Sequence, residues 1–448
     1  MFKKIIHLAL AATLILLFVR PNTTISAADP EVIVYTVDSL LDLPDFAHNS
    51  VCSAGSPANG PCTLRAALME ASRCPESACP EGVNIQIPAG TYAVTIPPVD
   101  PYINTDADGD LDIANSFGVQ ITLEGAANGQ TVISANNGDR VFDIAGNGLV
   151  VFRNLVIRGG RLQLQGSFMP TGAGIFNYGT LELQQVTLED NRLTCLPPDD
   201  GNCYQAVGGA IKNHGTLLIN MSTIRNNQAA RGGGIFNTSG AGGVLRILNT
   251  SIHDNLAIWA GGGLQNYATV SILNSTISNN VSQYYYGGVV NDGVGTMSLA
   301  NVTIASNYGR YYGGGNLYNV STLRIRNSII ADPLGEAGQN NCHDSSAAGW
   351  TSTGYNLYSD ASCAVTGTGD LASTDPRLSP LGDFGGWNLT RALLAGSPAH
   401  DRRPGYCTEF DTGFTITTDQ RGANRNALCD IGAFEGVGHL LFLPVVRR

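Results

Sequence analysis

The densest set of possible metal ligands in the chain is an acidic segment at residues 104–112. Carboxylates alternate with other residues in this segment, at Asp106, Asp108, Asp110 and Asp112. Oxygen ligands at this spacing, with Gly109 to let the chain turn, suit calcium as in EF-hand loops, although the distal Glu and the flanking helices of that motif are absent. The alternative is an acidic turn that leads into a strand at residues 111–113. We therefore expect no required cofactor, and a structural role for any bound calcium.

A second set of candidate residues consists of aromatic and basic side chains close to glycine pairs. They are Trp259, Tyr284, Tyr285, Tyr286, Tyr311 and Tyr312, with Arg231 and Arg310 near the same edge. If the turns that carry them are stacked, the rings form a strip. Flat aromatic strips suit the faces of sugars, and arginines can bind carboxylates or sulfates. The pattern predicts a carbohydrate-binding strip; the alternative is that the rings stack only to shield a corner of the fold.

Carboxylates that could serve acid–base catalysis are sparse in the same region. Asp190 and Asp254 occupy equivalent positions two repeats apart, hence roughly 9–10 Å apart if the repeats stack regularly. That distance is near the separation found in inverting glycoside hydrolases. Asn226 stands between them, and solvated turn carboxylates are the alternative interpretation. A polysaccharide lyase would instead need an Arg or Lys base facing carboxylates that hold calcium. The sequence leaves the catalytic residues unknown.

The aromatic, basic and catalytic candidates, unlike the acidic segment, lie on a repeat that occurs six times between Ala173 and Pro333. Each copy has a Gly pair, an aliphatic residue, an Asn two positions later, and alternating aliphatic residues that end in an Asn-rich turn. One aliphatic column contains Leu181, Leu217, Leu245, Val270, Met297 and Leu323, and another contains Ile175, Ile211, Ile235, Leu264, Val289 and Leu317. Spacing of i, i+2 and i+4 is typical of strands, and the copies follow one another every 25 to 36 residues. This period predicts a parallel β-helix.

Polar columns accompany the aliphatic ones. One contains Asn177, Asn213, Asn237, Asn266, Asn291 and Asn319, and another contains Gln185, Met221, Asn249, Asn274, Asn301 and Asn327. Asn columns in stacked repeats can form amide ladders, in which each carboxamide donates to the next. Glycines occur at 172, 208–209, 232–234, 261–263 and 313–315. We expect these glycines to allow positive φ at a sharp corner.

The N-terminal residues and the charge bear on the compartment and the partners. Residues 1–28 have the pattern of a secretory signal peptide, with Lys3 and Lys4, an apolar run at 5–19 and a small-residue cleavage site. An uncleaved anchor is the alternative, but the run is shorter than the roughly 20 residues of a spanning helix. The net charge of −11 argues against nucleic acid. It would also repel acidic polysaccharides, which only a local basic patch could hold. We expect a secreted or cell-surface protein with no transmembrane segment after cleavage.

The cysteines support an oxidising compartment. The ten cysteines form five close pairs: Cys52/Cys62, Cys74/Cys79, Cys195/Cys203, Cys342/Cys363 and Cys407/Cys429. An even number in local pairs predicts disulfides that close loops. Zinc is the alternative, but it favours tight spacings such as C-x₂-C, which none of these pairs has.

The ends of a solenoid need caps, because the terminal rungs would otherwise expose apolar and unpaired strands. Residues 61–71 form the one convincing helix, with Thr63 as a possible N-cap, and we expect it to cover the first rung. After Pro333 the repeat gives way to a Gly-, Ser- and Asp-rich region. The predicted domains are a signal peptide at 1–28, an N-terminal cap with disulfides at 29–82, a β-helix at 83–335, a C-terminal cap at 336–435 and an apolar and basic tail at 436–448.

At these residues the chain resembles known families. Residues 62–67 resemble the CSLREA motif that opens many secreted bacterial β-helix proteins, with Thr for Ser and Ala for Glu. Stretches at 375–378, 396–399, 419–422 and 429–435 resemble the choice-of-anchor Q region at the end of such chains. The resemblance implies a parallel β-helix and an extracellular or surface location, and it implies no particular reaction. Repeat segments such as 224–227 and 252–255 are also similar to the repeats of polymorphic outer-membrane proteins, which are adhesins.

The sequence thus predicts an all-β, single-stranded right-handed parallel β-helix of the pectin-lyase-like kind, with an N-terminal helical cap and an irregular C-terminal cap. Handedness follows from the resemblance and from the crossover rule. The predicted function is non-enzymatic adhesion or carbohydrate contact at the cell surface, with a polysaccharide or cell-surface glycan as the partner. A polysaccharide lyase or glycoside hydrolase of the same fold is one alternative, and a structural surface-layer component is another.

Overall fold

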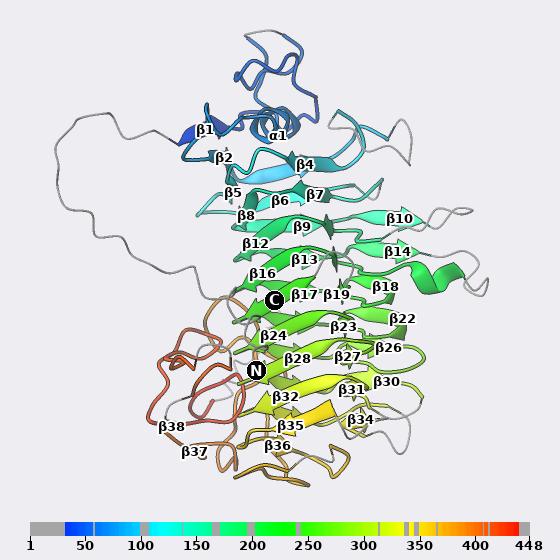
Figure 1. Ribbon diagram of the computed structural model, residues 1–448, viewed down its shortest axis with the longest axis vertical. Coiled ribbons are helices and arrows are strands. Elements are labelled where there is room, and N and C mark those ends of the chain that lie inside the picture. The colour runs from blue at the N-terminus through cyan, green and yellow to red at the C-terminus, as the bar shows by residue number, and fades with distance from the viewer. Residues whose placement is uncertain are drawn as a thin grey trace, which may run out of the picture. The chain divides into compact units, whose positions relative to one another are not determined.

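In the computed structural model, short parallel strands from successive repeats stack into four sheets, and side chains from three of these sheets form the main apolar core (Figure 1). The structure describes residues 32–56, 59–98, 107–136, 138–163, 171–194, 202–238, 243–311, 314–335, 340–344, 349–363, 366–405, 407–410 and 413–438. The expected signal peptide, Asp106, Cys195 and Tyr312 lie outside these residues. The predicted all-β parallel β-helix is confirmed.

We name the sheets in the order in which one repeat visits them. Sheet A contains β4 (Leu111–Asn115), β7 (Phe142–Gly146), β11 (Ile175–Asn177), β15 (Ile211–Asn213), β19 (Ile235–Asn237), β23 (Leu264–Asn266), β27 (Val289–Asn291), β31 (Leu317–Asn319) and β34 (Cys342–Asp344). Sheet B contains β1 (Ile33–Thr36), β2 (Val83–Ile87), β5 (Ile121–Gly125), β8 (Leu149–Arg153), β12 (Thr180–Gln184), β16 (Thr216–Asn220), β20 (Val244–Leu248), β24 (Thr269–Leu273), β28 (Thr296–Ala300), β32 (Thr322–Arg326) and β35 (Trp350–Ser352).

The other two parallel sheets complete each repeat. Sheet C contains β3 (Gly90–Ala93), β6 (Thr131–Ser134), β9 (Leu155–Arg158), β13 (Thr187–Glu189), β17 (Thr223–Arg225), β21 (Ser251–His253), β25 (Thr276–Ser278), β29 (Thr303–Ala305), β33 (Ile329–Ala331) and β36 (Leu357–Tyr358). Sheet D contains β10 (Arg161–Gln163), β14 (Arg192–Thr194), β18 (Gln228–Arg231), β22 (Leu256–Ala260), β26 (Val281–Ser282) and β30 (Tyr308–Gly309). A 3-10 helix, η1 (Asn202–Gln205), and an antiparallel pair, β37 (Arg403–Pro404) and β38 (Leu428–Cys429), lie outside these sheets.

The strand register matches the aliphatic columns of the sequence. Ile175 of β11 pairs with Ile211 of β15, and Ile211 pairs with Ile235 of β19. In sheet B, Leu181 pairs with Leu217 in the same way. These side chains are almost completely buried in the core. The stack also continues on both sides of residues 83–335, because β1 pairs with β2 and β35 pairs with β32.

Two ladders of Asn side chains run through the stack. The predicted ladder starts at Asn177 and continues through Asn213, Asn237, Asn266 and Asn291 to Asn319, with Nδ2 to Oδ1 distances of 2.7 to 2.8 Å. A second, unpredicted ladder runs from Asn191 through Asn227, Asn255, Asn280, Asn307 and Asn316 to Asn341, at 2.8 to 3.0 Å. Each buried carboxamide therefore has partners in the rungs above and below it, as a buried polar group requires.

The column that begins at Gln185 has a different role from the one expected. Its members have positive φ, for example 57° at Gln185 and 47° at Asn274, and they form the turn between sheets B and C. Asn tolerates the left-handed conformation better than most residues, which explains its frequency there. In this column the structure records an amide-to-amide bond from Asn274 to Asn249, at 3.3 Å, rather than a continuous ladder.

The glycines between sheets D and A also divide into two roles. Gly232 has φ of 58°, as predicted for the corner, whereas the next residue, Gly233, does not have positive φ. A Cβ atom on Gly233 would lie 2.7 Å from the carbonyl oxygen of Gly262 in the next rung. The second glycine is therefore needed for close stacking of the corners rather than for its backbone conformation.

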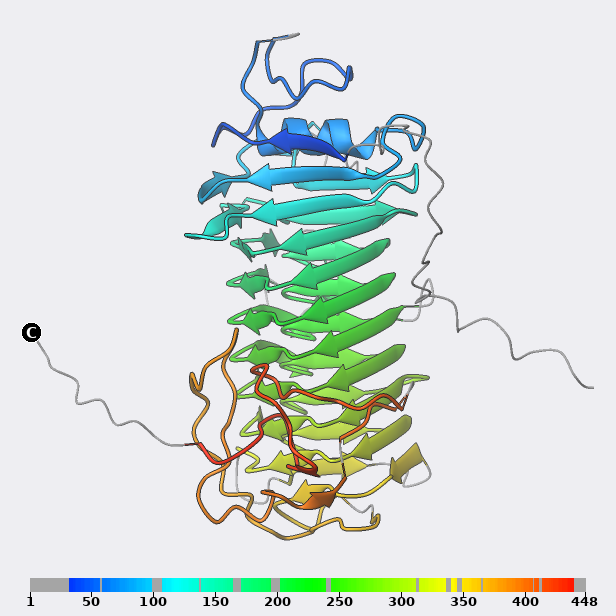
Figure 2. The ribbon, with the colours of Figure 1, turned by 90° about the vertical axis from the view of Figure 1, so that its left-hand side faces the viewer.

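The N-terminal helix is where the sequence predicts it. Helix α1 (Leu64–Ser72) has Thr63 as its N-cap, and the Thr63 hydroxyl accepts a hydrogen bond from Ala66 N at 3.1 Å. Its buried residue Leu68 joins the same core as Val83 of β2, so the helix covers the first rungs (Figure 2). Among the described residues, no helix is long and apolar enough to cross a membrane.

The C-terminal region packs along the flank of the stack and so does more than cover its last rung. We call residues 375–438 the C-terminal strap; the orange and red segments of Figures 1 and 2 show it beside the lower rungs. Asn388 Nδ2 donates to the Asn249 carbonyl at 2.7 Å, and Thr276 Oγ1 donates to Gln420 Oε1 at 2.6 Å. The strap thereby supplies partners to the turn between sheets B and C.

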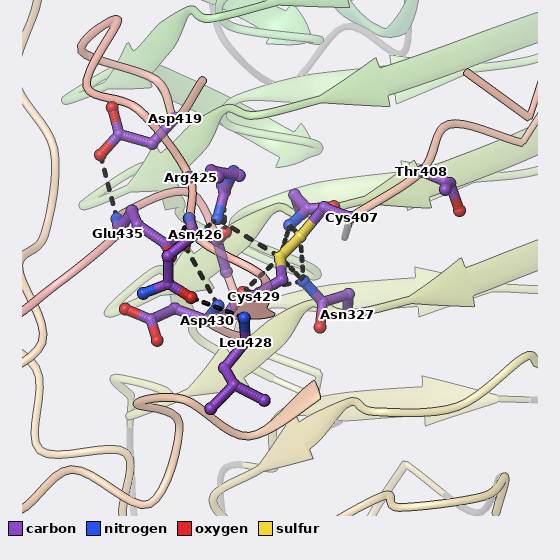
Figure 3. Close-up of a disulfide and its surroundings, with 12 residues drawn as sticks. Asn327, Cys407, Thr408, Asp419, Arg425, Asn426, Leu428, Cys429, Asp430 and Glu435 are labelled. Atoms are coloured by element: carbon purple, nitrogen blue, oxygen red, sulfur yellow. Dashed lines mark hydrogen bonds and ion pairs between the residues drawn. A yellow bond between two sulfur atoms is a disulfide. The ribbon is translucent and has the colours of Figure 1, made fainter. Parts of the chain in front are cut away.

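A disulfide anchors the strap. Four of the predicted pairs are formed: Cys52–Cys62, Cys74–Cys79, Cys342–Cys363 and Cys407–Cys429. Figure 3 shows Cys407–Cys429 beside Asn327, whose Nδ2 lies 3.1 Å from Cys407 Sγ and donates to the Asp430 carbonyl at 2.8 Å. The disulfide therefore lies directly on a turn residue of the stack.

The fifth predicted pair, Cys195/Cys203, differs from the other four, because only Cys203 belongs to the residues that the structure describes. Cys203 lies in η1, where it is buried in a small apolar cluster with Leu193 and Ala206 beside sheet D. Its sulfur is disulfide-bonded, so the zinc alternative does not apply to it. Its pairing with Cys195 is not confirmed and stays a prediction, since Cys195 lies outside the described residues.

Candidate functional site

The outer face of sheet A carries the most concentrated aromatic and basic side chains of the stack. In β11 and β15 the first and third residues are buried and the middle residue is partly exposed, so the middle residues form an outward column. Paired strands align Phe176, Lys212, Phe236, Gln265, Val290, Tyr318 and His343 in this column. Adjacent rungs therefore place rings and a cation side by side at the inter-strand spacing of about 4.8 Å.

Four rungs of this face form an open groove, which we call the sheet A groove. Its volume is about 600 Å³, and Phe176, Tyr178, Lys212, Arg231 and Tyr267 are among the residues that line it. The lining residues that the structure describes include two cations and no carboxylate. The groove is thus an aromatic and locally basic surface on a chain whose net charge is −11.

Aromatic rings in the groove contact each other at steep angles. The ring centres of Phe176 and Tyr178 lie 4.4 Å apart with an angle of 60° between the planes. Phe236 and Tyr267 lie 5.5 Å apart at 38°. His214 stacks on Tyr178 at 4.7 Å. The tilted rings act as walls of the hollow, an arrangement suited to a flat apolar ligand surface.

Arg231 is held in the groove by polar and aromatic contacts. Its Nε donates to the Tyr204 carbonyl at 2.9 Å, and its Nη1 donates to the Tyr267 hydroxyl at 3.1 Å. The Tyr267 hydroxyl donates in turn to Asp292 Oδ2 at 2.8 Å. The guanidinium also lies 4.0 Å from the centre of the Tyr204 ring. These contacts fix its position while other N–H groups of the guanidinium stay available to a ligand.

Lys212 differs from Arg231 in its lack of a hydrogen-bond partner among the described residues. Its Nζ lies 5.0 Å from the centre of the Phe176 ring, and no described residue forms an ion pair or hydrogen bond with it. Burial, followed by the charges of Arg140 and Arg231, lowers the pKa of Lys212 to about 8. Burial and the charge of Lys212 also lower the pKa of His214 to about 4, so His214 is neutral at pH 7.

The acidic segment lies at the N-terminal end of the same face. Ligand oxygens of Asp110, Asp112 and Asp143 lie within 4.8 Å of one another, so the structure joins two of the predicted calcium ligands with a third that was not predicted. Arg140 already contacts this group, with Nη1 2.6 Å from Asp143 Oδ2 and 3.3 Å from Asp110 Oδ2. The arginine therefore supplies the positive charge that a cation would bring.

Main-chain oxygens of the acidic segment are also engaged. Arg65 of α1 donates to the carbonyls of Gly109, at 2.8 Å, and Asp110, at 3.0 Å. Its Nε pairs with Asp42 Oδ1 at 2.7 Å. Asp108 does not belong to the carboxylate group of Asp110. The segment thus links the helical cap to sheet A, with Arg65 and Arg140 among its described partners.

The predicted aromatic strip is divided by the corner between sheets D and A. Trp259 stacks on Tyr284 with centres 4.6 Å apart, and Tyr284 lies 6.3 Å from Tyr311. These rings come from consecutive rungs, with Tyr285 6.3 Å from Trp259 and Arg310 5.1 Å from the Tyr311 ring. We call this set the corner strip. Trp259 and Tyr284 cover part of each other's faces, as the shielding alternative expects, whereas Tyr284 and Tyr311 keep exposed surface.

Two residues expected in the strip lie on the other side of the corner. Tyr286 takes the corner position that glycine holds in other rungs, and its ring stacks on Tyr318 of sheet A at 3.8 Å. Arg231 ends β18, and its side chain reaches into the sheet A groove. The chain bends between these residues and the corner strip, but ring contacts still connect them to it. Tyr286 lies 6.1 Å from Tyr285, and Arg231 reaches Trp259 through the Tyr204 ring. Their role in binding carbohydrate stays a prediction.

Sequence reasoning missed the middle column of sheet A. Phe176 and Phe236 each lie between a predicted core residue and a predicted ladder residue. Because alternate residues of a strand point to opposite faces, this position alone places both side chains on the outer face. Lys212 occupies the same place and is the only lysine after Lys4. That rarity was an available signal. The sequence did not reveal the bend of the chain that brings Arg231 beside Lys212.

Comparison with known proteins finds similar solved structures at low sequence identity. No protein-family model and no curated protein matches the chain. The crystal structure of pectate lyase Pel9A is similar, with 14% identity, a TM-score of 0.47 and coverage of 90% of this chain and 97% of that one. The complex structure of XylC with xylose has 11% identity, a TM-score of 0.44 and coverage of 79% and 66%. These similarities concern the β-helix and say nothing of activity.

Proposed function

We propose that the protein contacts carbohydrate at the cell surface or in secreted form, through the sheet A groove, and that it does so without catalysis. The observation that carries this proposal is the open groove with tilted aromatic walls on consecutive rungs. Concave aromatic surfaces with a few fixed polar groups suit the faces and hydroxyls of sugars.

Binding to a panel of polysaccharides tests this proposal, with affinity electrophoresis followed by calorimetry on the best polymer. Tyr178→Ala removes a ring that is 49% exposed and should weaken binding about tenfold. Trp387→Ala is the matched control, because Trp387 is an exposed aromatic residue on the C-terminal strap. The proposal fails if Tyr178→Ala binds like the unmodified protein, or if both variants lose affinity equally.

A polysaccharide lyase is the second candidate, and the lowered pKa of Lys212 is the observation that favours it. With a pKa of about 8, about one tenth of the amine is neutral at pH 7 and able to act as a base. The amine would take the proton from the ring carbon beside a sugar carboxylate, and the electron pair would form a carbon–carbon double bond. The glycosidic oxygen would leave with its bonding pair and take a proton from water.

Ultraviolet absorbance of the new double bond separates the two candidates. The binding proposal predicts that a uronate polymer keeps its length and gains no absorbance after long incubation. Unsaturated chain ends that disappear in Lys212→Met would replace the binding proposal with the lyase. A glycoside hydrolase is not favoured, because the described lining of the groove offers no carboxylate pair.

A further inference from the structure

The amine of Lys212 is placed where a ligand charge would be its partner. It is the middle residue of β15, between the buried Ile211 and the ladder residue Asn213, so its side chain must leave the core on the groove side. The side chain is only partly exposed, and its Nζ lies over the Phe176 ring. The ring shields one side of the ammonium group, and the groove is open on the other.

The charges around Lys212 are positive or already paired. Arg140 lies on the same ring, 5.1 Å from its centre, and is paired with Asp110 and Asp143. Arg231 bonds to main-chain and hydroxyl oxygens, which are neutral. A partly buried ammonium group without a counter-ion costs free energy, and an anion that enters the site recovers it.

The rest of the surface makes this local charge distinctive. The chain has 25 basic and 36 acidic residues, so a polyanion is repelled over most of it. Many other cations are already paired, for example Arg225 with Glu189 at 2.6 Å and Arg421 with Asp419 at 2.6 Å. The sheet A groove instead combines two cations with a described lining that contains no acid.

We infer that the sheet A groove binds an acidic saccharide, whose carboxylate or sulfate pairs with Lys212 and Arg231 while the sugar face lies on the aromatic walls. This inference rests on the proposed carbohydrate contact and names the class of ligand. Charge-assisted hydrogen bonds from two cations fix the anionic group, and the rings accept the apolar face of the sugar. A neutral saccharide contacts only the aromatic rings and gains no charge-assisted hydrogen bond.

Matched oligosaccharides test the inference on the full chain from residue 29. Calorimetry compares a galacturonate oligomer, a neutral galactose oligomer of the same length and a sulfated galactose oligomer. Either acidic ligand should bind about tenfold more tightly than the neutral one, and Lys212→Met should remove that difference. Lys212→Arg is the control that keeps the charge, and it should retain most of the preference. The acidic ligand that binds more tightly identifies the anionic group.

A chemical footprint reports contact directly. Because Lys212 is the only lysine after Lys4, acylation of side-chain amines in this protein reports on one residue, and the modified peptide can be quantified by mass spectrometry. A bound acidic oligomer should slow acylation of Lys212 about tenfold at saturation, and the neutral oligomer should slow it less. Equal protection by both ligands would overturn the inference.

The two proposals fail in different ways. Equal affinity for acidic and neutral oligomers, with loss of both in Tyr178→Ala, keeps carbohydrate binding and overturns the acidic specificity. An acidic preference that persists in Lys212→Met overturns the role of Lys212. Absence of binding to any of the three oligomers and to the polymer panel overturns both proposals.

Discussion

Arg425 and Glu435 form an ion pair inside the C-terminal strap, with Arg425 Nη1 2.9 Å from Glu435 Oε2 and both side chains buried (Figure 3). Arg425 Nη2 also donates to Asn274 Oδ1 at 2.9 Å, so the pair connects the strap to a turn of the stack. A buried charge in this position depends on its ion-pair partner, because water cannot take the place of that partner.

Loss of Glu435 should therefore destabilise the protein strongly. Glu435→Ala leaves the Arg425 guanidinium buried without its carboxylate, and we expect a decrease of about 3–5 kcal/mol in the free energy of unfolding. Chemical denaturation followed by circular dichroism measures it. Glu409→Ala is the control, because Glu409 pairs with the more exposed Arg246, and it should cost less than about 1 kcal/mol. Similar costs for both variants would contradict the buried-pair account.

Lys212 should make stability depend on pH in the alkaline range. Its pKa is about 8 in the folded protein and 10.5 without burial, so between these values the unfolded chain binds more protons. Stability should rise with pH across this window, by about 1–2 kcal/mol once the partial exposure of the side chain is taken into account. His214 is already neutral in this range.

Lys212→Met is the comparison that isolates this effect. The variant should be more stable than the parent protein at pH 7, and the difference should shrink as the pH approaches 10. Thermal unfolding at several pH values provides both curves. A constant difference between them would show that Lys212 does not titrate in this window.

The second Asn ladder should contribute directly to stability. Asn255 accepts from Asn227 Nδ2 and donates to Asn280 Oδ1, each at 3.0 Å, and its side chain is fully buried. Asn255→Leu removes the side-chain bonds to both neighbouring carboxamides and leaves the buried carbonyls of Ile224 and His253 without this donor. We expect a loss of about 2–4 kcal/mol. Asn226→Gly, at an exposed position with φ of 55°, should change stability by less than about 1 kcal/mol. Denaturant midpoints that move equally would argue against the ladder.

Calcium should not stabilise the protein while Arg140 is present. The guanidinium of Arg140 already balances Asp110 and Asp143, so added calcium or a chelator should leave the melting temperature unchanged. In Arg140→Ala the carboxylates lose this partner, and millimolar calcium should then raise the melting temperature by several degrees. A calcium-dependent shift in the parent protein would instead support the original calcium assignment at residues 104–112.

The periodic part of the fold was predictable, because equivalent residues of successive repeats are stacked in one column and are therefore of the same chemical type. Leu181 pairs with Leu217 as the alignment of repeats requires, and Thr63 caps the helix as its residue type suggests. The ladder through Asn227 was not predicted, although five of its residues, from Asn191 to Asn307, were visible as the last Asn of their repeats. Its burial depends on a fourth strand per rung, in sheet D, which the short and variable segments there did not reveal.

The candidate site was predictable only in part, because it depends on how side chains meet across a corner. Tyr285 and Tyr286 are adjacent in sequence, yet one belongs to the corner strip and the other stacks on Tyr318. Likewise, the path of the C-terminal strap follows from individual bonds such as Asn388 to Asn249, which have no periodicity. Irregular segments carry no repeated signal, so their position required the structure.

The path of the C-terminal strap affects how the protein unfolds. In a bare solenoid each rung contacts only its neighbours, so rungs can be lost one at a time from an end. Here Asn388 bonds at the rung of Asn249, while Asp430 bonds at the rung of Asn327, several rungs away. Rungs far apart along the stack thus share one covalently continuous clamp, and their loss becomes a single cooperative event.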